Sequence, residues 1–396
     1  MSSNDWAEVK ASEICRSVSV THSFDKDHLI FLNTGDIARG KFFHRDYSEV
    51  KLMPGQAKKS IRKNDILFSE IRPANGRYAM VDFDADDYLV STKLMVIRAN
   101  EKVLPKYLYF FLTSNETTAW LQHLAESRSG TFPQITFDHV ADLDVGLPPI
   151  QTQQRIVDFI SALDDKIELN RQTNAALEAI AQAIFKEWFV DFTFPGATGE
   201  MVESELGLIP QGWRVKPLDK IAEFLNGLAL QKYPPDEDEE YLPVIKIREL
   251  RNGVTASSDK ASKNIPEKFI IDDGDLIFSW SGSLVVTFWI GGKGALNQHL
   301  FKVTSDNYPL WFCYFWLLHH LDEFQRIVED KTTTMGHIKR GHLSEALCLV
   351  PEQITEMHSV INPIVDRMIL LQQETLAIAR LRDALLPKLM NGEIEV

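Results

Sequence analysis

The sequence contains one internal repeat, and a repeat that spans half a chain constrains the fold more than any local pattern does. Residues 64–69 recur as residues 274–279, each a polar turn followed by a short apolar strand. An aromatic-rich helix that starts at Pro105 recurs at Pro309. Later matches keep the same order along the chain: Leu147, Pro149, Gln151, Asp164 and Lys186 correspond to Leu349, Pro351, Gln353, Asp366 and Lys388. We therefore expect the chain to fold as two similar halves.

Each half ends in a segment with the heptad spacing of a coiled coil. Alternating steps of four and three residues give the first seam, Ile156, Ile160, Leu163, Ile167, Asn170, Asn174, Leu177, Ala181, Ile184 and Trp188. The second seam follows the same spacing and comprises Ile361, Ile364, Met368, Leu371, Thr375, Ile378, Arg382, Leu385 and Leu389. Asn170, Asn174 and Thr375 are polar residues at core positions, which costs stability but restricts register. The two predicted helices can pair with each other.

The predicted fold class is α+β, with two similar mixed α/β domains separated by two long antiparallel coiled-coil helices and related by a pseudo-twofold axis. Pro363 lies inside the second heptad run, so we expect that helix to kink or to begin late, and to end at Pro387 and Gly392. Glycine and proline at Pro195 and Gly196 indicate a linker between the halves. The predicted segments are a first domain at 1–150, a helix at 151–193, the linker at 194–204, a second domain at 205–350 and a helix at 351–396.

Composition argues against several classes of protein. The net charge of −14 is unlike that of proteins that coat nucleic acid without sequence preference, because those neutralise phosphates with excess Lys and Arg. The three cysteines, Cys15, Cys313 and Cys348, are widely separated and have no zinc-ligand spacing. The longest aromatic run, 310–318, is too short to cross a bilayer, and residues 1–14 lack the pattern of a secretory leader. These features predict a cytoplasmic protein.

The two helical segments and their flanks resemble the specificity subunits of Type I restriction-modification systems. Residues 147–157, 163–170 and 184–192 resemble the central conserved helix of that family. Residues 205–213 resemble the opening of its second target-recognition domain, and residues 386–394 resemble its C-terminal signature. The resemblance covers nearly the whole chain.

The resemblance implies that each domain reads one half of a split site on double-stranded DNA. The helices would set the gap and dock two modification subunits, which bind S-adenosylmethionine and transfer methyl groups. Restriction subunits would supply ATP- and Mg-dependent translocation and cleavage. This chain itself would bind no cofactor and no metal, and would catalyse no reaction.

The sequence contains few matches to catalytic motifs, and those few give little support for an enzymatic function. Residues 291–293 lack the first glycine and the hydroxyl residue of a phosphate-binding loop. The acidic-x-Lys triplets 49–51 and 329–331 fit a nuclease motif, but such triplets arise readily in a charged chain. Two alternatives stay open: an enzyme with fused methylase and nuclease domains, and a coiled-coil scaffold whose globular ends bind protein.

The candidates for DNA contact lie around the recurring strand, above all in the loop after it, and in two further loops that precede the long helices and could clamp phosphates. Arg can bond guanine and Asn or Gln can bond adenine bidentately, so loops rich in these residues suit base readout. The candidates in the first domain are Lys58, Lys59, Arg62, Lys63, Arg72, Asn75, Arg77, Arg128, Ser129 and Thr131. Those in the second domain are Arg248, Trp280, Ser281, Ser283, Lys293, Asn297, Gln298, His299, Thr333, His337 and Lys339. The alternatives are a solvated charged surface and a polar turn.

A partner-docking surface is expected where the first long helix ends. Trp188, Phe189 and Phe192 are large apolar side chains at that end. A helix pair that awaits partner subunits can expose apolar surface, so these three residues are the candidates for docking the modification subunits. The acidic run at residues 236–240 would repel DNA and is expected to lie away from the recognition surface.

Overall fold

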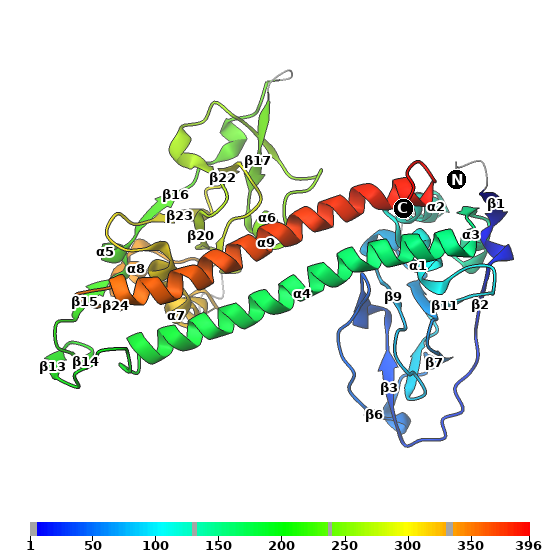
Figure 1. Ribbon diagram of the computed structural model, residues 1–396, viewed down its shortest axis with the longest axis horizontal. Helices are drawn as coiled ribbons and strands as arrows, with labels where there is room; N and C mark the ends of the chain where they lie inside the picture. Colours follow the sequence, from blue (N-terminus) through cyan, green and yellow to red (C-terminus); the bar gives the residue numbers. More distant parts are fainter. Residues whose placement is uncertain (1–5, 129–132, 237–239, 330–335) are drawn as a thin grey trace. The chain divides into compact units, whose positions relative to one another are not determined.

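The computed structural model divides into two compact units (Figure 1). Unit 1 comprises residues 1–166 and 378–396, and unit 2 comprises residues 167–377. The structure describes residues 6–128, 133–236, 240–329 and 336–396. Each unit therefore contains one of the predicted globular blocks together with a part of each long helix.

Unit 1 is built on two four-stranded sheets. The first sheet is antiparallel and has the strand order β2-β11-β8-β9. The second has the order β6-β3-β10-β7, in which β3 and β10 are parallel. Two-stranded ribbons β1–β12 and β4–β5 complete the unit. The strands are β1 (Ala7–Lys10), β2 (Cys15–Ser17), β3 (His28–Leu32), β4 (Ile37–Ala38), β5 (Lys41–Phe42), β6 (Ser48–Glu49), β7 (Ala57–Ser60), β8 (Ile66–Ser69), β9 (Tyr78–Met80), β10 (Tyr88–Ser91), β11 (Leu94–Ala99) and β12 (Asp144–Leu147).

The central strand β8 is buried on both faces. Successive side chains of a strand point to opposite sides of the sheet. Ile66 and Phe68 therefore join the core under the helices, whereas Leu67 joins the core between the sheets. The helices of this unit are α1 (Pro105–Thr113), α2 (Asn115–Arg128) and α3 (Phe137–Ala141).

Unit 2 repeats this plan. Its antiparallel sheet has the order β16-β23-β20-β21, and its second sheet has the order β18-β17-β22-β19 with β17 and β22 parallel. The ribbon β15–β24 corresponds to β1–β12, and a hairpin β13–β14 precedes it. The strands are β13 (Met201–Ser204), β14 (Gly207–Pro210), β15 (Arg214–Pro217), β16 (Glu223–Asn226), β17 (Tyr241–Ile245), β18 (Lys260–Ser262), β19 (Ile270–Ile271), β20 (Leu276–Ser279), β21 (Val286–Phe288), β22 (Gly294–Leu296), β23 (Leu300–Thr304) and β24 (Leu347–Val350). The helices are α5 (Leu218–Ile221), α6 (Ile247–Asn252), α7 (Leu310–Glu329) and α8 (Arg340–Glu345).

The recurring motif at 64–69 and 274–279 is confirmed as one turn and strand built twice. The two strands are β8 and β20, and the turn residue before each has positive φ (Asn64 74°, Gly274 91°). Each turn also holds an aspartate, which pairs with a cation on the neighbouring strand of the sheet, β11 in unit 1 and β23 in unit 2. In unit 1 the Asp65 carboxylate lies 2.7 Å from Nε of Arg98, and in unit 2 the Asp275 carboxylate lies 2.8 Å from Nζ of Lys302. The repeat therefore includes a charge pair as well as an apolar strand.

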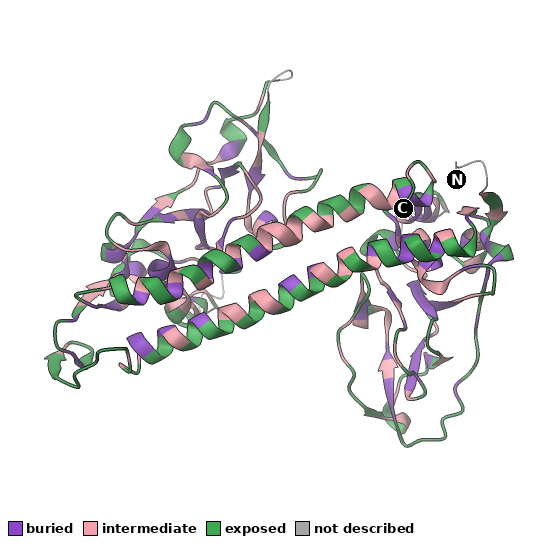
Figure 2. Cartoon of the chain, in the orientation of Figure 1, coloured by how far each residue is buried: buried purple, intermediate pink, exposed green. Residues whose placement is uncertain are grey.

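The long helices α4 (Ile150–Phe189) and α9 (Thr355–Met390) pack together along the predicted seam. Arg382 donates to the Asp164 carboxylate at 2.6 Å, and Asn170 donates to the Glu374 carboxylate at 3.0 Å. Because partners of later α4 residues come earlier in α9, the two helices are antiparallel. Figure 2 shows buried and exposed positions alternating along both helices, as a coiled coil requires.

The expectation that the second long helix would begin late because of Pro363 was wrong, whereas its end lies two residues before Gly392, close to the predicted end. Helix α9 begins at Thr355, upstream of Pro363, and continues through Pro387 to Met390. Pro363 is the ninth residue of α9, beyond the first four amides that lack intrahelical partners, so it removes one bond to the carbonyl of Ser359 without ending the helix. Among the described residues, no helix is both long enough and apolar enough to cross a membrane.

The apolar end of α4 is largely buried within unit 2. Phe189 is 0% exposed and packs against Trp213 and Phe312, and Trp188 is 8% exposed. The expectation of an exposed docking surface is therefore wrong for Phe189, because Trp213, Trp311 and Phe312 of the same unit cover its ring. Trp188 lines a pocket of this unit, and its contact with a partner stays a prediction. Phe192 is half-buried, and its contact with a partner stays a prediction.

Asn174 provides a test of the helix seam. Its side-chain oxygen is buried and accepts no hydrogen bond from any part of the chain that the structure describes. Asn174→Leu is therefore expected to increase the free energy of unfolding by about 1 kcal/mol, since it removes an unpaired buried acceptor. Asn170→Leu is the matched control and should lower it, because it deletes the bond to Glu374. Urea unfolding followed by circular dichroism measures both; changes of the same sign would contradict this account of the seam.

Candidate nucleic-acid interface

In unit 1, the loop after β8 presents two of the candidate base readers. Arg72 and Asn75 are exposed, and Arg72 has a left-handed backbone with φ of 45°. The base of the loop is fixed: the Arg72 amide donates to the Pro133 carbonyl at 3.1 Å, and the Ala74 amide donates to the Gln122 side chain of α2 at 3.1 Å. A non-glycine residue with positive φ needs such support and is often found at functional sites.

Arg77 and a hairpin that sequence reasoning missed complete this surface. Arg77 is half-buried and donates to the carbonyls of Gly35 and Ile37, so it supports the β4–β5 hairpin. At the hairpin tip, the Arg39 amide donates to the Gly76 carbonyl at 2.8 Å, and a Cβ added to Gly76 would lie 3.0 Å from Cγ of Arg39. The exposed Arg39 therefore lies over the loop that carries Arg72. No sequence signal links the two, because they are far apart in the chain.

The other basic candidates of unit 1 lie elsewhere or have structural partners. Arg62 and Lys63 are exposed but precede β8, whereas Arg72 follows it. The ammonium of Lys59 donates to the carbonyls of Thr92 and Leu94, and burial lowers the pKa of Lys59. Lys58 is exposed on β7. The side chain of Arg128, together with Ser129, Thr131 and, in the second domain, Thr333, lies outside the described residues.

In unit 2, the loop after β20 carries a cluster of aromatic and polar side chains. The Trp280 indole N–H donates to Oδ1 of Asn226 at 2.9 Å, and its ring lies 5.7 Å from that of His299 and 6.0 Å from that of His337. Asn226 was missed, because a single asparagine at a strand end has no distinctive sequence pattern. The sequence-predicted Trp280, His299 and His337 are thus brought together.

His299 links two further candidates. Its Nδ1 lies 3.1 Å from Oγ of Ser281 and its Nε2 lies 3.3 Å from Nε2 of Gln298. A neutral imidazole with its proton on Nδ1 satisfies both contacts, donating to the hydroxyl and accepting from the amide. The Gln298 side chain is thereby oriented beside the His299 ring, whose own neighbour is Trp280.

The remaining candidates of unit 2 are spread over several places. Asn297 is 6% exposed, and its Oδ1 accepts a hydrogen bond from the His299 amide at 3.2 Å. Asn297 therefore stabilises a polar turn, which was the alternative to base readout for this residue. Arg248 bonds the buried Glu249 carboxylate at 2.8 Å. Lys293 is exposed but follows a turn whose Gly292 amide bonds Asp273, at the start of β20. Ser283 and Lys339 are exposed near the cluster, after β20 and before α8.

The two loops occupy equivalent places in their units. An isolated antiparallel bridge joins Ile71, after β8, to Gln134, which leads toward α3, β12 and α4. A matching bridge joins Ser281, after β20, to His337, which leads toward α8, β24 and α9. In each unit, one backbone bridge therefore joins the candidate DNA-contact loop to the segment that leads into a long helix.

The Arg39 hairpin gives a test of moderate size. Arg39→Ala is expected to weaken DNA binding about threefold and to reduce the slope of log K against log salt by about one, as loss of one phosphate contact does. Fluorescence anisotropy of the assembled complex with target DNA, at several salt concentrations, measures both quantities. Lys51→Ala, an exposed cation beside Glu49, serves as the control. An unchanged salt slope for Arg39→Ala would place this hairpin off the DNA.

Comparison with known proteins identifies the repeated domain. Residues 3–179 and 210–347 match the family model described as the Type I restriction modification DNA specificity domain. The chain is 34% identical over 465 residues to the Type I restriction enzyme HindI specificity subunit of Haemophilus influenzae, covering 99% of this chain and 100% of that protein. It is 28% identical to the MjaIX specificity subunit of Methanocaldococcus jannaschii, covering 74% of this chain and 70% of that protein.

A solved structure shares the fold. The S subunit of a Type I restriction-modification system from M. genitalium superposes with a TM-score of 0.55 over 97% of this chain and 96% of that one, at 10% identity. The family model matches one domain in each half of the repeat, so the sequence match and the duplicated architecture agree. The chain belongs to the family of Type I restriction modification DNA specificity domains and resembles the specificity subunits of Type I restriction enzymes over its full length.

Proposed function

We propose that this chain is the DNA-reading subunit of a Type I restriction-modification complex, in which each unit reads one half of a bipartite site. One observation carries the proposal: the same domain occurs twice, and each copy presents a polar loop after its central strand, at Arg72 and at Trp280. Two similar readers on one chain suit a DNA site with two half-sites.

The side chains of the two loops differ, so the two half-sites should differ as well. Arg72 has the geometry to bond guanine bidentately, and the amide of Gln298 can bond adenine. Trp280 offers an aromatic face for apolar contact with a thymine methyl group. The helices α4 and α9 would set the number of base pairs between the half-sites.

The chain would work with partners that perform the chemistry. Two modification subunits would bind S-adenosylmethionine and methylate the DNA, and restriction subunits would use ATP and Mg for translocation and cleavage. The chain itself would catalyse no reaction and would act in the cytoplasm. Family membership supports this assignment over a fused methylase-nuclease or a protein-binding scaffold.

Methylation mapping tests the proposal. The chain is co-expressed with the modification subunit encoded beside it, and methylated bases are mapped across the host genome by long-read sequencing. The expected result is one split motif, two short half-sites separated by a fixed gap. A stable complex that leaves no motif would favour the protein-binding scaffold instead.

A further inference from the structure

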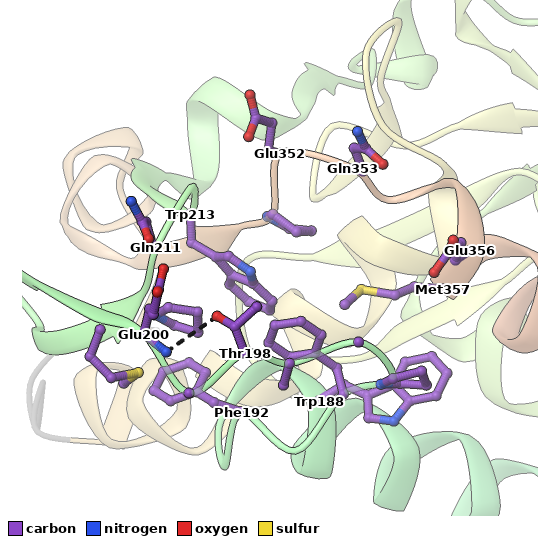
Figure 3. A pocket seen from close by; sticks show the side chains of 18 of the residues that line it. Trp188, Phe192, Thr198, Glu200, Gln211, Trp213, Glu352, Gln353, Glu356 and Met357 are labelled. Carbon is purple, nitrogen blue, oxygen red and sulfur yellow. Dashed lines mark hydrogen bonds between the residues drawn. The ribbon is translucent and has the colours of Figure 1, made fainter.

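Unit 2 contains a cavity of about 450 Å³ where α4 ends and α9 begins. Aromatic and thioether side chains line it, and Figure 3 shows four of them, Trp188, Phe192, Trp213 and Met357. Phe194 also lines the pocket. The rings of Phe192 and Phe194 lie 5.9 Å and 5.1 Å from that of Trp213. Its volume is typical of a pocket that binds a ligand or a partner side chain.

The rim of this pocket carries negative charge. Glu200, Glu352 and Glu356 line it and are exposed, and no Lys, Arg or His is among its lining residues in the described chain. Aromatic rings attract a cation over their faces, and carboxylates pair with it at the edge. An occupant with a positive charge and a long aliphatic stem fits both parts of the pocket.

The equivalent place in unit 1 has such a side chain in its lining. A cavity of about 20 Å³ there is lined by Trp6, Pro149 and the C-terminal residues Ile394 and Glu395, and also by Arg155. Tryptophan, carboxylate and guanidinium thus line one small cavity in unit 1. In unit 2 the tryptophan and carboxylates recur, the cavity is larger, and no guanidinium lines it.

A surface beside the pocket indicates that the occupant belongs to a protein. The β13–β14 hairpin and α9 expose Met201, Val202, Leu206, Leu208 and Val360, and two of these residues, Met201 and Val360, also line the pocket. Several large apolar residues exposed on one hairpin and the adjoining helix are typical of protein-protein interfaces. A small soluble cation would use the pocket but not this surface.

We propose that this acid-rimmed aromatic pocket binds an arginine or lysine side chain of the modification subunit, with the exposed hairpin packing against the same partner. The proposal rests on the proposed function, since it takes the modification subunit as the partner. Of the three residues predicted to dock a partner, it retains Trp188 and Phe192 as pocket walls and leaves Phe189 in the core beneath.

The test uses the full chain and the purified modification subunit. The triple variant Glu200→Gln, Glu352→Gln and Glu356→Gln keeps the shape of the rim and removes its charge. Its affinity for the modification subunit, measured by isothermal titration calorimetry, is expected to fall about tenfold at low salt and less at high salt. The matched control Glu267→Gln, Asp306→Asn and Asp322→Asn removes three exposed carboxylates outside both the pocket and the β13–β14 hairpin, and should change affinity less than about twofold.

A cross-link identifies the occupant. A photoreactive phenylalanine at exposed Gln353, on the pocket rim, should cross-link to one segment of the modification subunit. A basic residue of that segment is then changed to Gln and combined with Glu352→Gln. Coupling between the two substitutions, so that the pair together costs clearly less than the sum of the singles, is the expected outcome.

Several results would overturn the inference. The triple variant could bind the modification subunit as tightly as the control variant does, or the effects of the two substitutions on affinity could be strictly additive. Either result would show that no basic side chain of the partner binds in the pocket. A wild-type dimer that the triple variant dissociates would assign the pocket to a second copy of this chain. These failures are distinct from failure of the proposed function: a wild-type complex that still methylates a split motif would preserve that function, whereas absence of a motif would remove it whatever the pocket binds.

Discussion

Replacement of Arg98 by alanine is expected to unfold unit 1 or to destabilise it by about 3–5 kcal/mol, because the change leaves a buried carboxylate unpaired. The Asp65 side chain is 0% exposed, and both of its oxygens accept from Arg98, at 2.7 and 2.8 Å. The same carboxylate also accepts the Arg62 amide and so closes the turn before β8. Without the guanidinium, Asp65 must be protonated or hydrated, and either disturbs the central strand.

The repeat supplies the matched control for this substitution. Lys302→Ala removes the corresponding cation in unit 2, but the Asp275 side chain is 24% exposed and can be hydrated. Its expected cost is about 1 kcal/mol or less, as for partly exposed pairs. Thermal unfolding and hydrogen exchange resolved by residue would compare the two variants. Equal losses in the two units would show that burial of the aspartate does not decide the effect.

Replacement of Arg72 by alanine or by lysine is expected to weaken binding of the cognate DNA by about tenfold to a hundredfold, the range for one bidentate base contact. Lysine keeps the positive charge but lacks the planar guanidinium that forms two parallel hydrogen bonds. Weaker DNA binding by both variants would therefore indicate base readout, whereas weaker binding by the alanine variant alone would indicate a phosphate contact. The backbone at Arg72 has positive φ, so Arg72→Gly serves as a further variant without backbone strain.

The measurement for Arg72 uses both half-sites. Anisotropy of the assembled complex is compared on the full site and on DNA with either half-site scrambled. The Arg72 variants should lose discrimination at the half-site read by unit 1 and keep it at the other. Lys63→Ala, an exposed cation before β8 rather than after it, should leave discrimination unchanged. Equal discrimination by wild type and Arg72 variants would remove Arg72 from the base readers.

The long-range plan was predictable from the sequence because it repeats. The matches around 64–69 and 274–279 led to strands β8 and β20, and the heptad spacing led to the pair α4 and α9. The start of α9 was predicted less well, because Pro363 was expected to delay the helix, whereas the structure accommodates this proline in the third turn at the loss of one backbone hydrogen bond.

The candidate recognition surface was predictable only in part, because it is assembled from residues that strand pairing brings together. Trp280, His299 and His337 were named from their local loops, and the cluster they form depends on the bridge between Ser281 and His337. Arg39 was not predicted, because no local sequence pattern indicates that its hairpin bonds to Gly76, which lies far along the chain. Phe189 was expected to be exposed and is buried. A run of large apolar residues does not indicate which of them pack against other parts of the same chain.

Unit 1 is built from two segments that are far apart in the chain, residues 1–166 and 378–396, and this has a consequence during synthesis on the ribosome. Leu389 and Met390, from the last turn of α9, are buried in the same core as Ile156 and Val145. The core of the first domain therefore stays incomplete until residues 378–396 have been translated, whereas residues 167–377 can fold before that. Deletion of Leu389 and Met390 should therefore impair recognition by the N-terminal half while unit 2 still folds.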